Sequence, residues 1–114
     1  MNNVNNVSLY NDLSKWNVQN LVTTDFMFLA CSRLVSLDLS NWNCNNLHSA
    51  YQMFSECDSL ISINMKNISF NNVLVNKMFS SSPKLSIVRM KNINTRNNEI
   101  MFYDCSINTN FVID

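Results

Sequence analysis

The chain has 114 residues, of which 46% are hydrophobic and 14% are charged, and its eight basic and eight acidic side chains give a formal net charge of zero. This length predicts a single domain, and the neutral balance argues against a nucleic-acid-binding protein, which usually carries a basic excess. The longest apolar run, Phe26–Cys31, is far too short to span a bilayer, so no membrane partner is expected. Gly is absent, so Asn is expected wherever the backbone needs a positive φ.

The first residues, Met1–Asn6, contain neither a basic segment nor an apolar one, so they do not resemble a secretory signal. Read literally, the chain is expected in the cytoplasm. As a fragment of a longer protein, it would instead be expected at the cell surface.

The dipeptide Met-Phe recurs at residues 27–28, 53–54, 78–79 and 101–102, in steps of 26, 25 and 23 residues. A nearly fixed period in this range predicts a solenoid, in which each repeat is one coil that buries its apolar side against its neighbours. We therefore expect one domain over residues 1–114 with about four repeats of 23–26 residues. Capping coils are expected at about residues 1–15 and 105–114.

Each repeat contains a short segment in which apolar and polar residues alternate, which is typical of a half-buried strand. These segments are Leu9–Leu13, Val35–Leu39, Ile61–Met65, Ser86–Met90 and Thr109–Ile113. Because they occupy matching positions in successive coils, they predict one parallel sheet. Its connections are expected to be right-handed, as parallel crossovers generally are.

An Asn-rich corner follows each strand, and its Asn residues fall in two registers: Asn41, Asn67 and Asn92 in one, and Asn20, Asn46 and Asn72 in the other. We expect these side chains to hydrogen-bond backbone groups that the corner leaves unpaired. The return leg then carries Thr24, Met27, Phe28 and Cys31 and their equivalents at i, i+3, i+4, i+7 spacing. This spacing predicts a short helix, so the predicted fold class is an α/β repeat solenoid with helices opposite the sheet.

The segment Leu37–Asn43, followed by Met53-Phe54 and Cys57–Leu60, resembles the BspA-type leucine-rich repeat, which also occurs in surface proteins of the mycoplasma-lipoprotein type. The resemblance covers residues 9–114. It implies a short curved solenoid used for adhesion or protein binding, without enzymatic activity. The family commonly has a Gly before the repeat Cys, where this chain has Ala30, Glu56, Ser81 and Asp104.

The four cysteines are expected to pack rather than to bind metal. Cys31, Cys57 and Cys105 share one position of the repeat, Cys44 lies in a corner, and a zinc site needs ligands paired at short spacing. His48, the only histidine, has no nucleophile–carboxylate arrangement beside it in the sequence, and Trp16 and Trp42 fit core or corner positions. No catalytic residue, cofactor or metal is therefore expected.

The outward strand face offers the remaining candidates. Three rows of side chains are expected to cross it: Tyr10, Ser36, Ser62, Ile87 and Asn110; Asp12, Asp38, Asn64, Arg89 and Val112; and Ser14, Ser40, Lys66, Lys91 and Asp114. The charge along these rows is graded from acidic to basic. Residues 1–57 carry two basic and four acidic side chains, a net of 2 − 4 = −2, and residues 58–114 carry six and four, a net of 6 − 4 = +2.

These rows predict a non-enzymatic protein–protein interaction module that binds a partner with an acidic surface. The predicted partner-binding residues are Asp12, Asp38, Asn64, Lys66, Arg89 and Lys91. Three alternatives remain open at this point: a small phage- or mobile-element-encoded inhibitor that occludes a host enzyme such as a defence nuclease, a fragment of a cell-surface adhesin, and a hydrolase or metalloenzyme. Self-association through the exposed edge of an end coil is also compatible with this architecture.

Overall fold

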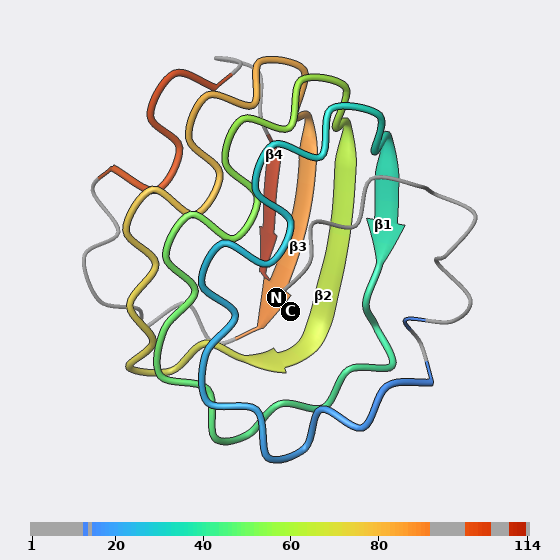
Figure 1. The fold of residues 1–114 in the computed structure, drawn as a ribbon, viewed down its shortest axis with the longest axis vertical. Coiled ribbons are helices and arrows are strands. Elements are labelled where there is room, and N and C mark those ends of the chain that lie inside the picture. Colours follow the sequence, from blue (N-terminus) through green and yellow to red (C-terminus); the bar gives the residue numbers. More distant parts are fainter. Residues whose placement is uncertain (1–12, 14, 92–99, 106–109, 114) are drawn as a thin grey trace.

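The computed structural model describes residues 13, 15–91, 100–105 and 110–113, the last four as backbone only. Four strands form one sheet in sequence order, and every neighbouring pair is parallel (Figure 1). The strands are β1 (Ser36–Asp38), β2 (Ser62–Ser69), β3 (Ile87–Lys91) and β4 (Asn110–Ile113). From β1 to β2 and from β2 to β3, the chain runs round a corner and returns along the side of the molecule opposite the sheet (Figure 1).

The strands lie where the alternating sequence predicts them. Leu37, Ile63 and Val88 occupy the same position in β1, β2 and β3, and all three are buried. β2 is the longest strand because its pairing with β3 continues past an irregularity after Met65, where Ser69 lies opposite Lys91. The inward row thus forms one wall of the core, and the outward side chains of β1, β2 and β3 are exposed or half-buried.

The return legs consist of turns, so the predicted short helices are wrong for the described residues. In the first leg the amides of Met27, Leu29 and Cys31 donate to carbonyl oxygens three residues earlier, at 3.1–3.2 Å. The alternate amides of Phe26, Phe28 and Ala30 donate to carbonyl oxygens of the next coil, at 2.8–2.9 Å. An α-helix would direct every amide to the carbonyl four residues earlier in its own segment. Here alternate amides join neighbouring coils.

Residues with positive φ explain why the helix does not form. The first leg has Phe26 at φ 60° and Ala30 at φ 57°, and later legs repeat these positions at Gln52, Glu56, Lys77, Ser81 and Asp104. A left-handed residue interrupts the helical direction of the backbone and turns the next peptide towards the neighbouring coil. The expectation that Asn would supply positive φ is also wrong for seven of the eight described positions, Asn72 being the exception.

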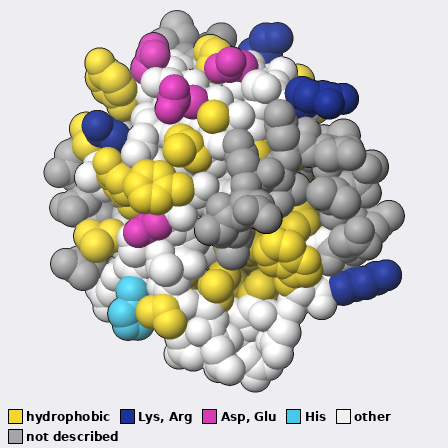
Figure 2. Space-filling view, viewed as in Figure 1, with side chains coloured by type: hydrophobic (Ala, Val, Ile, Leu, Met, Phe, Trp, Pro, Cys, Tyr) yellow, Lys and Arg dark blue, Asp and Glu magenta, His cyan; other side chains and the backbone are white. Residues whose placement is uncertain are grey.

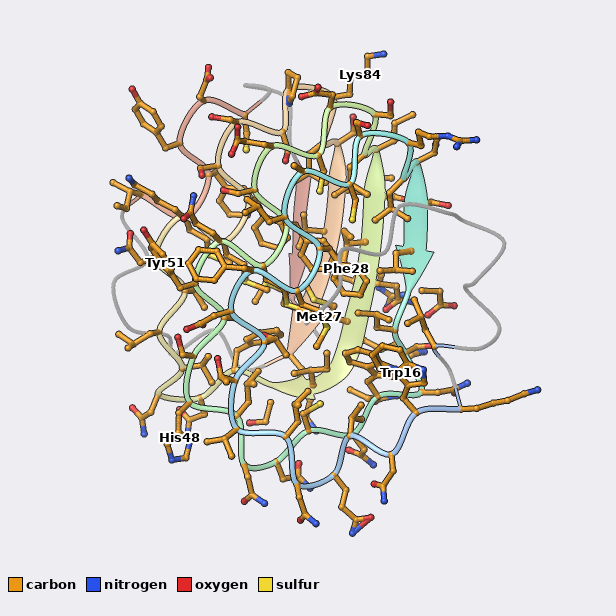
Figure 3. The ribbon with its side chains drawn as sticks, in the orientation of Figure 1. Trp16, Met27, Phe28, His48, Tyr51 and Lys84 are labelled. Atoms are coloured by element: carbon orange, nitrogen blue, oxygen red, sulfur yellow. The ribbon has the colours of Figure 1, made fainter. Side chains whose placement is uncertain are left out.

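A column of phenylalanine rings runs through the core along the stack of coils. Phe28, Phe54, Phe79 and Phe102 lie nearly parallel, with successive ring centroids 5.1, 5.7 and 5.1 Å apart. The first three are fully buried, and Figure 3 shows Phe28 and Met27 between the return leg and the strands. The Met-Phe period of the sequence is thus the period of this column.

The repeat cysteine position forms a second column beside the phenylalanines. The Sγ of Cys57 donates to the carbonyl of Phe28 at 3.2 Å, and the Oγ of Ser82 donates to that of Phe54 at 2.8 Å. Cys31, Cys44 and Cys57 are fully buried, which confirms their predicted packing positions. Because Ser82 makes the same type of bond as Cys57, hydrogen bonding as well as volume defines this position.

The corners hold neighbouring coils together through side-chain amides, as predicted. The Nδ2 of Asn67 donates to the carbonyl of Ser40 at 2.5 Å, and the Nδ2 of Asn46 donates to that of Gln19 at 3.5 Å. Further inside, the fully buried Trp42 donates its indole N–H to the carbonyl of Leu13 at 2.9 Å. The predicted core position is therefore confirmed for Trp42, whereas Trp16 stacks on it and stays 41% exposed.

Several predictions concern residues that the structure does not describe. The strand over Leu9–Leu13 and the capping coil at about 1–15 fall almost wholly outside the described residues. The capping coil at about 105–114 is described only at Cys105 and in the backbone of β4. The right-handed, leucine-rich-repeat-like solenoid as a whole stays a prediction.

Candidate functional site

A shallow groove of about 300 Å³ lies on the outward face of the sheet. It crosses β1, β2 and β3 and is lined by Ser36, Leu37, Asp38, Ser62, Ile63, Asn64, Ile87 and Arg89. The parallel register brings these residues together although they are far apart in sequence. Three predicted partner-binding residues, Asp38, Asn64 and Arg89, thus meet in one hollow.

These three side chains form a single row across the sheet. Asp38 pairs with Asn64, and Asn64 pairs with Arg89. Since neighbouring strands lie about 4.8 Å apart, the Cα atoms of Asp38 and Arg89 are separated by about 10 Å. Asp38 is exposed, whereas Asn64 and Arg89 are half-buried. The groove therefore has a carboxylate at one end of this row and a guanidinium at the other.

Local hydrogen bonds fix two side chains of this row. The Oδ1 of Asp38 accepts from the amide of Ser40 at 2.8 Å, and the Oδ1 of Asn64 accepts from the amide of Lys66 at 3.2 Å. Both are bonds to the backbone two residues on, which Asp and Asn form readily because their side chains are short. A side chain held in this way loses little conformational entropy when a partner binds.

Val35, Ile61 and Ile87 form an aliphatic edge at the groove, and of these three the sequence pattern places only Ile87 on the outward face. These side chains are 45%, 43% and 44% exposed. The amide of Ile61 donates to the carbonyl of Val35 at 2.7 Å, and that of Ile87 donates to the carbonyl of Ile61 at 3.1 Å, so the three backbones are neighbours. Alternation assigned Val35 and Ile61 to the core, which is wrong because each lies just before the regular strand begins. The one indication in the sequence was Ile87, an apolar residue that follows Ser36 and Ser62 in the outward row.

Two further predicted residues, Lys66 and Lys91, do not line this groove. Lys66 is half-buried and Lys91 is exposed, but Lys91 lies opposite Ser69, so the predicted Lys66–Lys91 row is wrong. The register shift in β2 after Met65 separates the two lysines. Asp12 is outside the described residues. The structure thus brings half of the predicted site together.

Burial keeps the cysteine thiols in their protonated form. Burial raises the pKa of Cys57 from 9.0 to about 12 and that of Cys44 to about 11, and it also raises the pKa of Cys105. These groups are therefore protonated near neutral pH, when the Sγ–H of Cys57 can donate to a carbonyl. Within the described residues, no group of three or more His, Cys, Asp or Glu side chains is arranged to hold a metal ion.

The sequence of residues 1–91 matches the family model DUF285, described as a Mycoplasma protein of unknown function. This match covers most of the chain, which therefore belongs to the DUF285 family. No curated protein and no solved structure matches the chain. In the part of the chain that the structure describes, no helix has the length and apolar character needed to cross a membrane.

Proposed function

We propose that this chain is a non-enzymatic protein-binding module whose partner contacts the outward face of the sheet. The observation that supports this most is the groove in which Asp38, Asn64 and Arg89 meet, one from each of three strands. Nothing in the repeat pattern requires an Arg on this face, because the equivalent positions hold Asp38 and Asn64. The fold therefore does not need the positive charge of Arg89, and this charge is available to distinguish the surface of the sheet.

The composition of the groove and its edge resembles that of protein interfaces. Arg is enriched in such interfaces, and their centres combine apolar contact with a few oriented polar groups. Here Arg89 and Ile87 lie in the groove, and Val35 and Ile61 extend the apolar contact along its edge. Contact with a partner would bury these aliphatic side chains and orient the partner through the polar row.

The charge distribution favours a partner segment that combines a carboxylate with an aliphatic side chain. Asp38 lies on β1 and Arg89 on β3, with the exposed Lys91 at the end of β3. An acidic group placed at β3 gains from Arg89 and Lys91, whereas the same group at β1 meets Asp38. Electrostatic complementarity of this kind mainly sets orientation and association rate.

We further propose that the architecture is a short BspA-type solenoid. The sequence period, the parallel register of the strands and the hydrogen bonds between return legs all support a coil stacked at a constant step. Such repeats typically offer an extended face to partners. The proposed face and the proposed architecture agree.

The test compares two charge reversals in a binding experiment. The tagged chain is used to capture its partner from a lysate of the source cell, and the affinity of the purified pair is then measured by calorimetry. We expect Arg89→Glu to weaken binding about 10- to 100-fold, the range for reversing a central interface charge. The matched control is Lys84→Glu, which changes the net charge equally at an exposed residue outside the groove (Figure 3).

Equal affinity of the wild type and Arg89→Glu would contradict the proposed face. The identity of the captured protein also decides between the alternatives. A host enzyme that loses activity on binding would favour the inhibitor, and an extracellular protein would favour the adhesin fragment.

A further inference from the structure

A second groove, of about 320 Å³, lies at the corner between the sheet and the return legs. It is lined by Gln19, Asn20, Asn43, Asn45 and Asn46, all of them exposed side-chain amides. The two corner segments that supply them run side by side along the foot of the view in Figure 1. We propose that this amide groove binds a neutral saccharide.

The chemistry of the lining supports this ligand class. A side-chain amide donates two hydrogen bonds and accepts two, which matches the hydroxyl groups of a sugar, each of them both donor and acceptor. None of the five lining residues is charged or apolar, and Figure 2 shows the lower edge of the molecule as largely white, with few charged or hydrophobic side chains. An anionic ligand would find no countercharge here, and an apolar one would desolvate amides without replacing their hydrogen bonds.

The groove is built by the backbone of two coils. The Nδ2 of Asn46 donates to the carbonyl of Gln19 at 3.5 Å, and the amide of Gln19 donates to the Oδ1 of Asn17 at 3.4 Å. Just beyond the groove, the amide of His48 donates to the carbonyl of Val22 at 2.8 Å. The bonds from Asn46 and His48 join the two coils and hold their corners in register, so the backbone that carries the amides is in place before a ligand arrives.

The volume of the groove, and the recurrence of its Asn residues in the next coil, indicate the size of the saccharide. Its volume lies at the lower end of the range for small-molecule sites, which suits one or two sugar units. The next coil places the exposed Asn71 and Asn72 at the repeat positions of Asn45 and Asn46. Stacked coils in register are about 4.8 Å apart, so this row of amides can continue along a longer oligosaccharide. We therefore expect a trisaccharide to bind more tightly than a monosaccharide.

The site is separate from the sheet groove, so it goes beyond the proposed protein binding and does not depend on it. The test uses saturation-transfer NMR and side-chain amide shifts of the full chain, with neutral N-acetylglucosamine and galactose oligomers of one to three units as probes. We expect binding with Kd in the range of about 0.1 to 10 mM. The shifted side-chain amides should be those of the groove.

The variant Asn20→Ala/Asn45→Ala removes two lining amides for which no bond to the rest of the chain is seen in the described residues, and it should weaken binding about tenfold or more. If this variant does not fold, Asn45→Asp keeps the shape and removes two donors, with the same expected direction. Lys84→Glu, at an exposed residue that lines neither groove, is the control and should bind as the wild type does. Failure of every neutral probe to bind, or unchanged affinity of the groove variants, would overturn the proposal.

Discussion

Replacing Ala30 by Gly provides the sharpest test of the return legs. Ala→Gly in a helix interior destabilises a protein by about 1 kcal/mol. At Ala30, where φ is 57° and the side chain is exposed, the sign should reverse. The same change therefore separates the observed turns from the helix that the sequence spacing predicts.

The magnitude follows from two opposing terms. A non-Gly residue in the left-handed region costs about 1–2 kcal/mol, which Gly does not incur. Gly also adds conformational entropy to the unfolded chain, which costs about 0.5–1 kcal/mol. The exposed methyl group of Ala30 contributes little packing. We therefore expect Ala30→Gly to raise the free energy of unfolding by about 0.5–1 kcal/mol.

Urea unfolding followed by circular dichroism measures this change, with Ala50→Gly as the matched control. Ala50 is fully buried and is not among the described residues with positive φ. Its replacement loses a buried methyl group as well as backbone rigidity, so it should lower the free energy of unfolding by about 1–2 kcal/mol. Destabilisation by Ala30→Gly similar to that by Ala50→Gly would refute the left-handed turn at Ala30.

Three further predictions concern the two core columns. Phe54→Ala removes a ring stacked on both sides and should lower the free energy of unfolding by about 3–5 kcal/mol in urea titrations, whereas a loss below about 1 kcal/mol would contradict its place in the column. Ser82→Ala leaves the carbonyl of Phe54 and the amide of Cys57 without their hydroxyl partner and should cost about 1–3 kcal/mol, while Ser82→Cys should restore most of it in the same assay. Burial raises the pKa of Cys57 from 9.0 to about 12, so as the pH rises the unfolded chain loses the thiol proton before the folded chain does. The contribution of the buried, protonated thiol to stability is therefore complete below pH 9.0 and is lost as the pH rises towards 12. Urea titrations at pH 8 and 10 should therefore show a larger loss of stability for the wild type than for Cys57→Ser, and equal losses would contradict the shift.

The parts of the fold that follow a short period could be predicted from the sequence. Alternation located β1, β2 and β3 because Leu37, Ile63 and Val88 alternate with residues facing outward. The Met-Phe steps predicted repeating core positions, which the column of stacked rings occupies. In both cases the same position of every repeat is buried in the core, so the same kind of apolar residue recurs there and can be recognised in the sequence.

The return legs could not be predicted in the same way, because turns and helices can share one spacing. Thr24, Met27, Phe28 and Cys31 lie at helical intervals, yet left-handed residues at Phe26 and Ala30 direct alternate amides to the next coil. The available indication was that BspA-type repeats, which this chain resembles, commonly have Gly at the position of Ala30 and its equivalents. Asn, the residue expected at positive φ, occurs there only at Asn72 among the described positions.

The part of the candidate site that lies in the regular register of the strands could also be predicted from the sequence. Asp38, Asn64 and Arg89 share a strand register, and sequence spacing alone places them in one row. Lys66 follows the regular part of β2, and Lys91 ends β3. The pairing of these strands shifts after Met65, so Lys91 lies opposite Ser69, and sequence spacing does not reveal such a shift. The corner amides were predicted as structural ties but not as the lining of a groove.

Site-specific photo-crosslinking tests the proposed binding face most directly. A photoreactive residue replaces either Ser36, which lines the sheet groove, or Tyr103, which is 65% exposed on the last return leg, and the captured partner is crosslinked by light. The proposed function predicts a crosslinked product from position 36 and none from position 103. A product from position 103 alone would place the partner on the opposite side of the molecule and contradict the proposal.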